Sequence, residues 1–236
     1  MNLKSKLKPT LSLLSAAIIS FALLAGGCKK PQQQPGEAPD VYKKRLVAIY
    51  FAQSGTGIDG FSDVIDAMVT NEVLSKPTGA KALELDTKAA KSWQEAVKRA
   101  KTGDFGQATI DKLNEAIKFA EDLEAVGVID LKDPKQKTDF TLVTKGLRLA
   151  LTSAKNLILA LNGPNFNTQI KQAEAEAQSF SKIGAALDIT NIVMVTLGRA
   201  AQQSWLPTAE AAYEDGEKIV AALLIKNDER IKAYRQ

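Results

Sequence analysis

The stretch Arg45–Gly60, RLVAIYFAQSGTGIDG, decides the fold class of this 236-residue chain. Two structures fit it. In one, Arg45–Ala52 is a strand that leads through a glycine-rich loop into a helix. In the other, the face shared by Tyr42, Leu46 and Ile49 belongs to a helix, and the glycines break the chain before a second helix. The first structure predicts an α/β protein, and the second predicts an all-α protein.

The α/β alternative implies a function. GTGIDG, Gly55–Gly60, matches the pattern G-x-G-x-x-G, in which glycines let the backbone approach a pyrophosphate. Lys81–Asp86 would be a second strand that ends in an acidic residue suited to a ribose, and two later segments would extend the sheet: Val126–Leu131 and Ile189–Leu197. Against this alternative, Gln53 and Ser54 separate the first strand from the first glycine, and a long helix-like segment follows Asp86. Because the glycine pattern and the possible strands still fit, we keep a nucleotide-binding α/β enzyme that uses GTGIDG as the alternative function.

Most of the chain favours helices. Apolar residues recur at steps of three and four from Ile110 to Leu123, and Gly127 is expected to end that helix. Asp133 before Pro134 is typical of a helix start, and the apolar Phe140–Leu161 predicts the central buried helix. The other helices are expected from Phe61 to Lys76–Gly79, from Asp86 or Thr87 to Gly103, from Ile170 to Leu187, and from about Thr208 to Tyr234.

We therefore predict an antiparallel bundle of about six or seven helices over residues 40–236, because short turns make sequential helices antiparallel neighbours. Trp93 and Trp205 are expected in its core. Asp63 and Asp66 are interpreted as part of a solvent-exposed face.

Composition excludes several kinds of site. The chain has no histidine and a single cysteine. Histidine is the commonest general base and metal ligand, so Ser-His-Asp and Cys-His arrangements and histidine-ligated zinc or haem are excluded within this chain. We predict no catalytic residues, no cofactor and no metal site.

Residues 1–28 have the layout of an export signal. A start with three lysines precedes an apolar run from Leu11 to Ala25, and the run closes with LLAGGC, Leu23–Cys28. This ending resembles the lipobox of bacterial lipoproteins. The resemblance implies that residues 1–27 are a signal peptide, that cleavage occurs before Cys28, and that Cys28 is acylated and anchors the chain to a membrane.

Residues 28–39 are expected to be the acylated cysteine and a flexible tether. Lys29–Pro39, KKPQQQPGEAP, contains three prolines and three glutamines and no large apolar residue. Its extended length is roughly 34 Å at 3.1 Å per residue. The lipobox resemblance also implies a location. The residue after Cys28 is Lys29 and not aspartate, which favours the outer membrane, on the side that faces the periplasm. The inner membrane and the cell surface are the alternatives.

The sequence predicts a non-enzymatic envelope protein. Three basic residues precede Cys28, so the chain from Cys28 onward keeps 28 basic and 27 acidic residues. A charge near zero gives no reason to expect nucleic acid as a partner. The expected function is binding or scaffolding by a lipid-anchored helical domain. Its partner would be an envelope protein, a cell-wall component or an apolar ligand.

Overall fold

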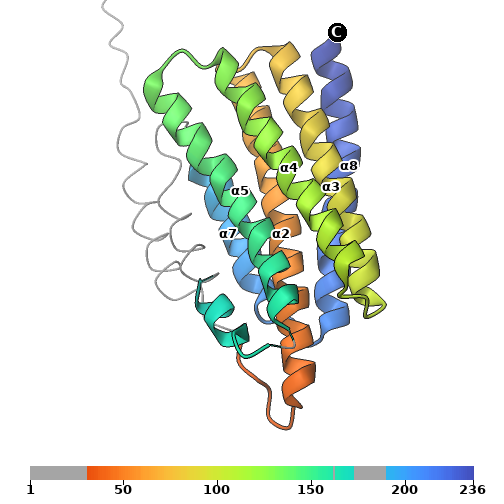
Figure 1. The fold of residues 1–236 in the computed structure, drawn as a ribbon. Coiled ribbons are helices and arrows are strands. Elements are labelled where there is room, and N and C mark those ends of the chain that lie inside the picture. Colours follow the sequence, from red (N-terminus) through yellow and green to blue (C-terminus); the bar gives the residue numbers. More distant parts are fainter. Residues whose placement is uncertain (1–30, 162, 173–189) are drawn as a thin grey trace, which may run out of the picture.

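The computed structural model describes residues 31–161, 163–172 and 190–236 (Figure 1). No strand occurs within these ranges, so the all-α prediction is confirmed and the α/β alternative is wrong. Cys28 and the signal peptide lie outside the described residues, as does most of the predicted helix Ile170–Leu187. The labelled helices are α2 (Pro39–Thr70), α3 (Lys76–Lys101), α4 (Gln107–Asp130), α5 (Pro134–Ala160), α7 (Thr190–Gln203) and α8 (Ala209–Arg235), and residues 166–172 are also helical.

The helices lie side by side as a bundle. Figure 1 shows α2, α3, α4 and α5 alternating in direction, as short connections require. Helix α8 runs parallel to α2, because Gly55 lies beside Val220 and Asp63 pairs with Arg230 further along both helices. Within the described residues, no helix is both long and apolar enough to cross a membrane.

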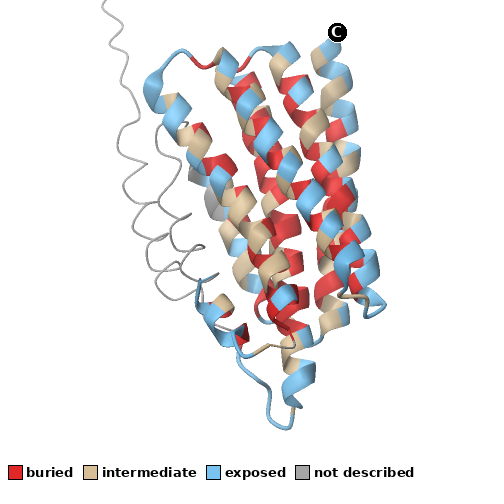
Figure 2. Ribbon diagram, viewed as in Figure 1, coloured by how far each residue is buried: buried red, intermediate tan, exposed pale blue. Residues whose placement is uncertain are grey.

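Helix α2 is the centre of the fold. It contacts α3, α5, α7 and α8, and 19 of its 32 residues are buried (Figure 2). The segment Phe140–Leu161, predicted to be the central helix, lies instead at one side as part of α5, where Leu142 and Leu159 are exposed. Its apolar pattern indicated that the helix is buried. The pattern could not show that α2, and not α5, takes the central position among the helices.

GTGIDG lies inside α2, so both predicted forms of Arg45–Gly60 are wrong at this point. The helix continues without a break from Pro39 to Thr70. Each glycine inside a helix costs about 1 kcal/mol relative to alanine. Packing outweighs this cost, since Gly55 lies against Trp93 and Gly60 lies against Thr196. These glycines let neighbouring helices approach closely and do not cradle a phosphate.

Several helix ends also differ from the prediction. Lys76–Gly79 starts α3, with Ser75 accepting a hydrogen bond from the Thr78 amide at 3.3 Å and a proline in the first turn. Asp86 lies in the middle of that helix and is no cap. Helix α4 continues past Gly127, whose missing side chain makes room for the ring of Phe140.

Three predicted local signals are confirmed. Asp133 caps α5 by accepting a hydrogen bond from the Lys135 amide at 2.7 Å. The last helix starts where it was predicted, at about Thr208, and the structure shows that Thr208 caps it by accepting a hydrogen bond from the Ala211 amide at 3.1 Å. Gly103 follows α3 with φ of 82°, a conformation that glycine adopts readily.

The strand alternative for Ile189–Leu197 is also wrong, because α7 begins at Thr190 and Ile189 lies outside the described residues.

The segment Pro31–Ala38, named the strap below, is not extended. Glu37 accepts two hydrogen bonds from Arg45, at 2.8 Å each, and both side chains are less than a tenth exposed. Arg45 also donates to the carbonyl of Gln32, and Tyr42 donates to the carbonyl of Pro31. The predicted tether is therefore folded back against the start of α2 over this part of its length.

Candidate functional site

Helix α2 presents two different faces to its neighbours. One face, named the packed face, meets α3 and α8 through close contacts and ion pairs. The opposite side, named the groove face, meets α5 and α7 and leaves space between them.

Trp93 holds the packed face together. Its ring is fully buried, and its indole nitrogen donates a hydrogen bond to Ser54 Oγ at 2.8 Å. A Cβ atom added at Gly55 would lie 2.8 Å from the ring, and one added at Gly216 would lie 3.0 Å from both the ring and the Ala52 Cα. Glycine is required at both positions, so the contact between α2, α3 and α8 is a tight structural contact with no room for a ligand.

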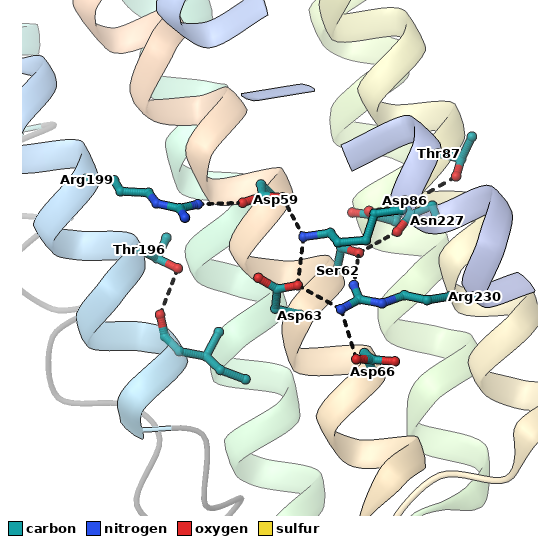
Figure 3. A network of polar contacts seen from close by, with 12 residues as sticks. Asp59, Ser62, Asp63, Asp66, Asp86, Thr87, Thr196, Arg199, Asn227 and Arg230 are labelled. Carbon is teal, nitrogen blue, oxygen red and sulfur yellow. Dashed lines mark hydrogen bonds and ion pairs between the residues drawn. The ribbon is translucent and has the colours of Figure 1, made fainter. Parts of the chain in front are cut away.

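A ladder of ion pairs continues the packed face toward the end of α2 (Figure 3). Lys226 donates to Asp59 and Asp63 at 2.7 Å each. Arg230 approaches Asp63 at 3.0 Å and Asp66 at 2.8 Å. Residues four apart lie on one face of a helix, so these pairs fix the register of α8 against α2.

Helix α7 joins the ladder at one point, where Arg199 donates to Asp59 at 3.0 Å. Asp59 is only 6% exposed, and it forms ion pairs with two cations from two helices, Arg199 of α7 and Lys226 of α8. This arrangement leaves Asp59 neutralised and fully used in holding helices together, so it is not a free acid for catalysis.

Asp86 of α3 lies deeper in the same network (Figure 3). It accepts a hydrogen bond from Asn227 at 2.9 Å, and Asn227 in turn accepts one from Ser62. Within the described part of the chain, Asp86 Oδ1 has no hydrogen-bond partner. Burial raises the pKa of Asp86 to about 8, and the hydrogen bond from Asn227 only partly opposes this. The Asp86 carboxyl therefore carries its proton at neutral pH.

The groove face contains a cavity, named the groove below, of about 120 Å³ that is partly open to the surface. It follows α2 from Tyr50 to Val64, which is about 21 Å of helix at 1.5 Å per residue. None of its lining residues is charged. They are Tyr50, Gln53, Ser54, Gly57, Gly60, Phe61 and Val64 from α2; Val143, Gly146, Leu147, Leu149, Ala150 and Ser153 from α5; and Ile192, Thr196, Leu197 and Ala200 from α7.

Glycines form the floor of the groove. A Cβ atom added at Gly57 would find its nearest neighbours, in Leu147 and Ala150, only at 3.9 Å. Gly60 lies further along the same floor, and Gly146 lies on the α5 wall. Gly57 therefore differs from Gly55, because a Cβ atom at Gly57 would lie at ordinary van der Waals distance from its neighbours, whereas one at Gly55 would clash with Trp93.

Three polar side chains in the groove wall are used within the protein. Gln53 donates to the Ala200 carbonyl at 3.0 Å and to Ser204 Oγ at 3.1 Å. Ser54 donates to the Phe51 carbonyl and Thr196 to the Ile192 carbonyl, each at 2.8 Å. With these donors satisfied, the groove offers mainly apolar contact.

In the described residues, no group of three or more acidic or cysteine side chains is placed to hold a metal ion. The carboxylates of the packed face are paired with cations, apart from the protonated Asp86. Of two accessible spaces in the described structure, the groove is the one with no charged lining residue, since the other, of about 380 Å³, is lined in part by Arg199 and Asp215.

The predicted site residues fall in different places. Cys28, the predicted lipidation site, lies outside the described residues and stays a prediction. Trp93 is in the core as expected, but Trp205 is 69% exposed, so its prediction is wrong. Asp63 and Asp66 are ion-paired with α8 and do not form a free solvent-exposed face. Their signal was present in the sequence: acids at steps of four and three match cations at a step of four in the last helix.

No family model, no curated protein and no solved structure matched this chain in comparisons with known proteins.

Proposed function

We propose that this chain is a lipid-anchored protein of the bacterial cell envelope whose helical domain binds an apolar, chain-like ligand in the groove. The observation that carries the ligand is the groove itself, a partly open cavity of about 120 Å³ with no charged lining residue, beside which Gly57 lacks a side chain. The anchor rests on the lipobox resemblance of Leu23–Cys28. The domain has no catalytic role in this proposal.

The shape and chemistry of the groove select the ligand class. Its lining extends along α2 and carries no charged residue, which suits a hydrocarbon chain, and its volume of about 120 Å³ is enough to bury a short part of such a chain. Its volume of about 120 Å³ resembles that of an engineered apolar cavity of roughly 150 Å³ that stays dry and binds benzene. Each buried CH₂ group contributes about 0.8 kcal/mol, so a partly buried acyl chain would bind measurably.

Mass spectrometry tests the anchor. In bacteria that acylate lipoproteins, we expect the membrane-extracted protein to begin at Cys28 and to carry the mass of a diacylglycerol or more. The variant Cys28→Ala should lose both the added mass and membrane association. An uncleaved leader or an unmodified Cys28 in the natural product would reject the anchor.

A fluorescent long-chain fatty acid tests the groove. The variant Gly57→Leu should weaken its binding at least tenfold, because the new side chain occupies the floor of the groove. Leucine is a better helix former than glycine, and its Cβ would lie 3.9 Å from the nearest atoms. Circular dichroism and thermal unfolding check that the larger leucine side chain leaves the fold intact. The matched control is Gly198→Leu, which makes the same exchange at an exposed site on α7 with nothing within 4 Å.

Three outcomes separate the possibilities. Loss of binding in Gly57→Leu but not in Gly198→Leu supports the groove. Equal binding by both variants and by the original protein would mean that the fatty acid binds elsewhere, which rejects the groove as its binding site. No binding by the original protein rejects an acyl chain as the ligand.

A further inference from the structure

We infer that the end of the bundle which carries the strap rests on the surface of the lipid bilayer, with Trp205 in the headgroup region. The inference rests on the proposed lipid anchor and adds an interaction surface to it. It differs from the arrangement that the sequence predicts, in which an extended tether holds the domain clear of the membrane.

The length of chain before the described structure limits the distance to the anchor. Only Lys29 and Lys30 separate Cys28 from Pro31, the first described residue. Three steps between consecutive Cα atoms span at most about 11 Å. The headgroup region adds about 5–7 Å on each side of the hydrocarbon core, so Pro31 must lie at or just outside it once Cys28 is anchored.

The strap keeps Pro31 beside the bundle. The buried pair Glu37–Arg45 closes the strap against α2, and Tyr42 binds the Pro31 carbonyl at 2.7 Å. Gln34 donates to the Pro207 carbonyl, in the turn between α7 and α8, at 3.1 Å. These contacts shorten the usable tether from eleven residues to two, so this end of the bundle cannot move far from the membrane.

The same turn carries an exposed tryptophan. Trp205, two residues before Pro207, is 69% exposed, whereas Trp93 is fully buried. Tryptophan is enriched at the interface between membrane and water, because its ring is apolar and its N–H group remains hydrated. Val41, in the first turns of α2 at this end, is also 57% exposed.

Charges at this end are mixed, so a lipid surface is favoured by apolar contact more than by charge. Exposed Lys44 and Asp40 lie near the start of α2, and exposed Glu210 lies near the start of α8. A contact of this kind should depend little on salt concentration. A strongly acidic or basic protein partner would have little to recognise here.

The test uses tryptophan fluorescence on vesicles that contain lipids brominated in their acyl chains. The chain from Cys28 onward is coupled through its single thiol to a maleimide lipid, so the result does not depend on acylation in a cell. We expect bromine to quench at least half of the Trp205 emission. The variant Trp205→Phe should show no quenching, since Trp93 is enclosed by the bundle.

The strap is tested with Glu37→Gln, which removes the charge that pairs with Arg45. Vesicle flotation should stay unchanged while quenching of Trp205 falls at least twofold, because the longer tether lets the bundle leave the surface. The matched control is Glu229→Gln, an exposed position near the end of α8, which should leave quenching unchanged. Circular dichroism confirms that each variant remains helical.

Quenching of Trp205 that is lost on opening the strap supports the inference. An unquenched Trp205 in protein that floats with the vesicles overturns it. Equal quenching in Glu37→Gln also overturns it, because the strap would then not hold the surface. If mass spectrometry shows that Cys28 is not acylated in bacteria, only the proposed anchor is rejected. The protein coupled to a maleimide lipid would still show, by quenching of Trp205, whether this end of the bundle contacts lipid.

Discussion

The two faces of α2 use glycine in opposite ways. On the packed face, Gly55 removes a side chain so that Trp93 can fill the space completely. On the groove face, Gly57 removes a side chain and the space stays open, with the nearest atoms 3.9 Å from an added Cβ. Gly60 on the groove face packs closely against Thr196, so the contrast is between Gly55 and Gly57 and not between all the glycines of the two faces.

Charged side chains are also distributed unequally between the two faces. The packed face holds Asp59, Asp63 and Asp66 in ion pairs with α8, and it buries Asp86. The groove has no charged lining residue. Ion pairs along α8 fix the register of the packed face, while the opposite side keeps an apolar space. We expect the largest losses of stability from changes on the packed face, and on the groove face we expect a cost at Gly60 but not at Gly57.

The largest expected effect comes from Trp93→Ala on the packed face. The substitution removes a fully buried ring and leaves a cavity between α2, α3 and α8, so we expect about 4 kcal/mol of destabilisation in denaturant unfolding. Trp205→Ala is the matched control and should change stability by no more than about 0.5 kcal/mol, because that ring is exposed. Equal losses in the two variants would contradict the division between the faces.

The next effect is a pH dependence from Asp86. Burial raises the Asp86 pKa from 3.8 to about 8, so the folded protein binds one more proton than the unfolded chain between these values. Stability from this group is full at low pH and is lost as pH rises toward 8, by about 1 kcal/mol per unit.

Asp86→Asn should remove that slope and exceed the original protein in stability by about 4 kcal/mol at pH 8, since the two pKa values lie about four units apart. Urea unfolding at pH 5, 6.5 and 8 measures this difference. The control Asp228→Asn changes an exposed carboxylate on α8 and should keep the slope of the original protein. If Asp86→Asn retains the slope, Asp86 is not the titrating group.

A smaller effect separates two glycines on the groove face. Gly60→Ala places a methyl group against Thr196 and should cost about 2 kcal/mol, because α2 and α7 must move apart. Gly57→Ala should be neutral or stabilise by up to about 1 kcal/mol, since alanine favours the helix and the space is open. Thermal unfolding of both variants gives the comparison. A cost at Gly57 as large as that at Gly60 would show that the groove is filled.

The sequence predicted local features of this fold well. The caps at Asp133 and Thr208 and the turn at Gly103 depend on hydrogen bonds and backbone angles within a few residues. Such signals can be recognised without knowing what the helix packs against. The all-α class followed from the same local patterns.

Features that depend on distant residues were predicted wrongly. Gly60 and Gly127 were interpreted as chain breaks, but each makes room for a side chain from another helix, Thr196 and Phe140 respectively. Asp86 was interpreted as a cap, although Asn227 accounts for its buried position. The groove itself is a space between three helices, so no single stretch of sequence indicates it.

The smallest expected effect tests whether charge or shape holds the packed face. Lys101 and Glu217 join α3 to α8 at 2.7 Å, with each side chain about a third exposed. A double-mutant cycle with Lys101→Met and Glu217→Gln should give a coupling of about 0.5 kcal/mol that shrinks in high salt, as for other exposed pairs. A salt-independent coupling above about 1 kcal/mol would mean that ion pairs at the edge, more than the packing around Trp93, hold these helices together.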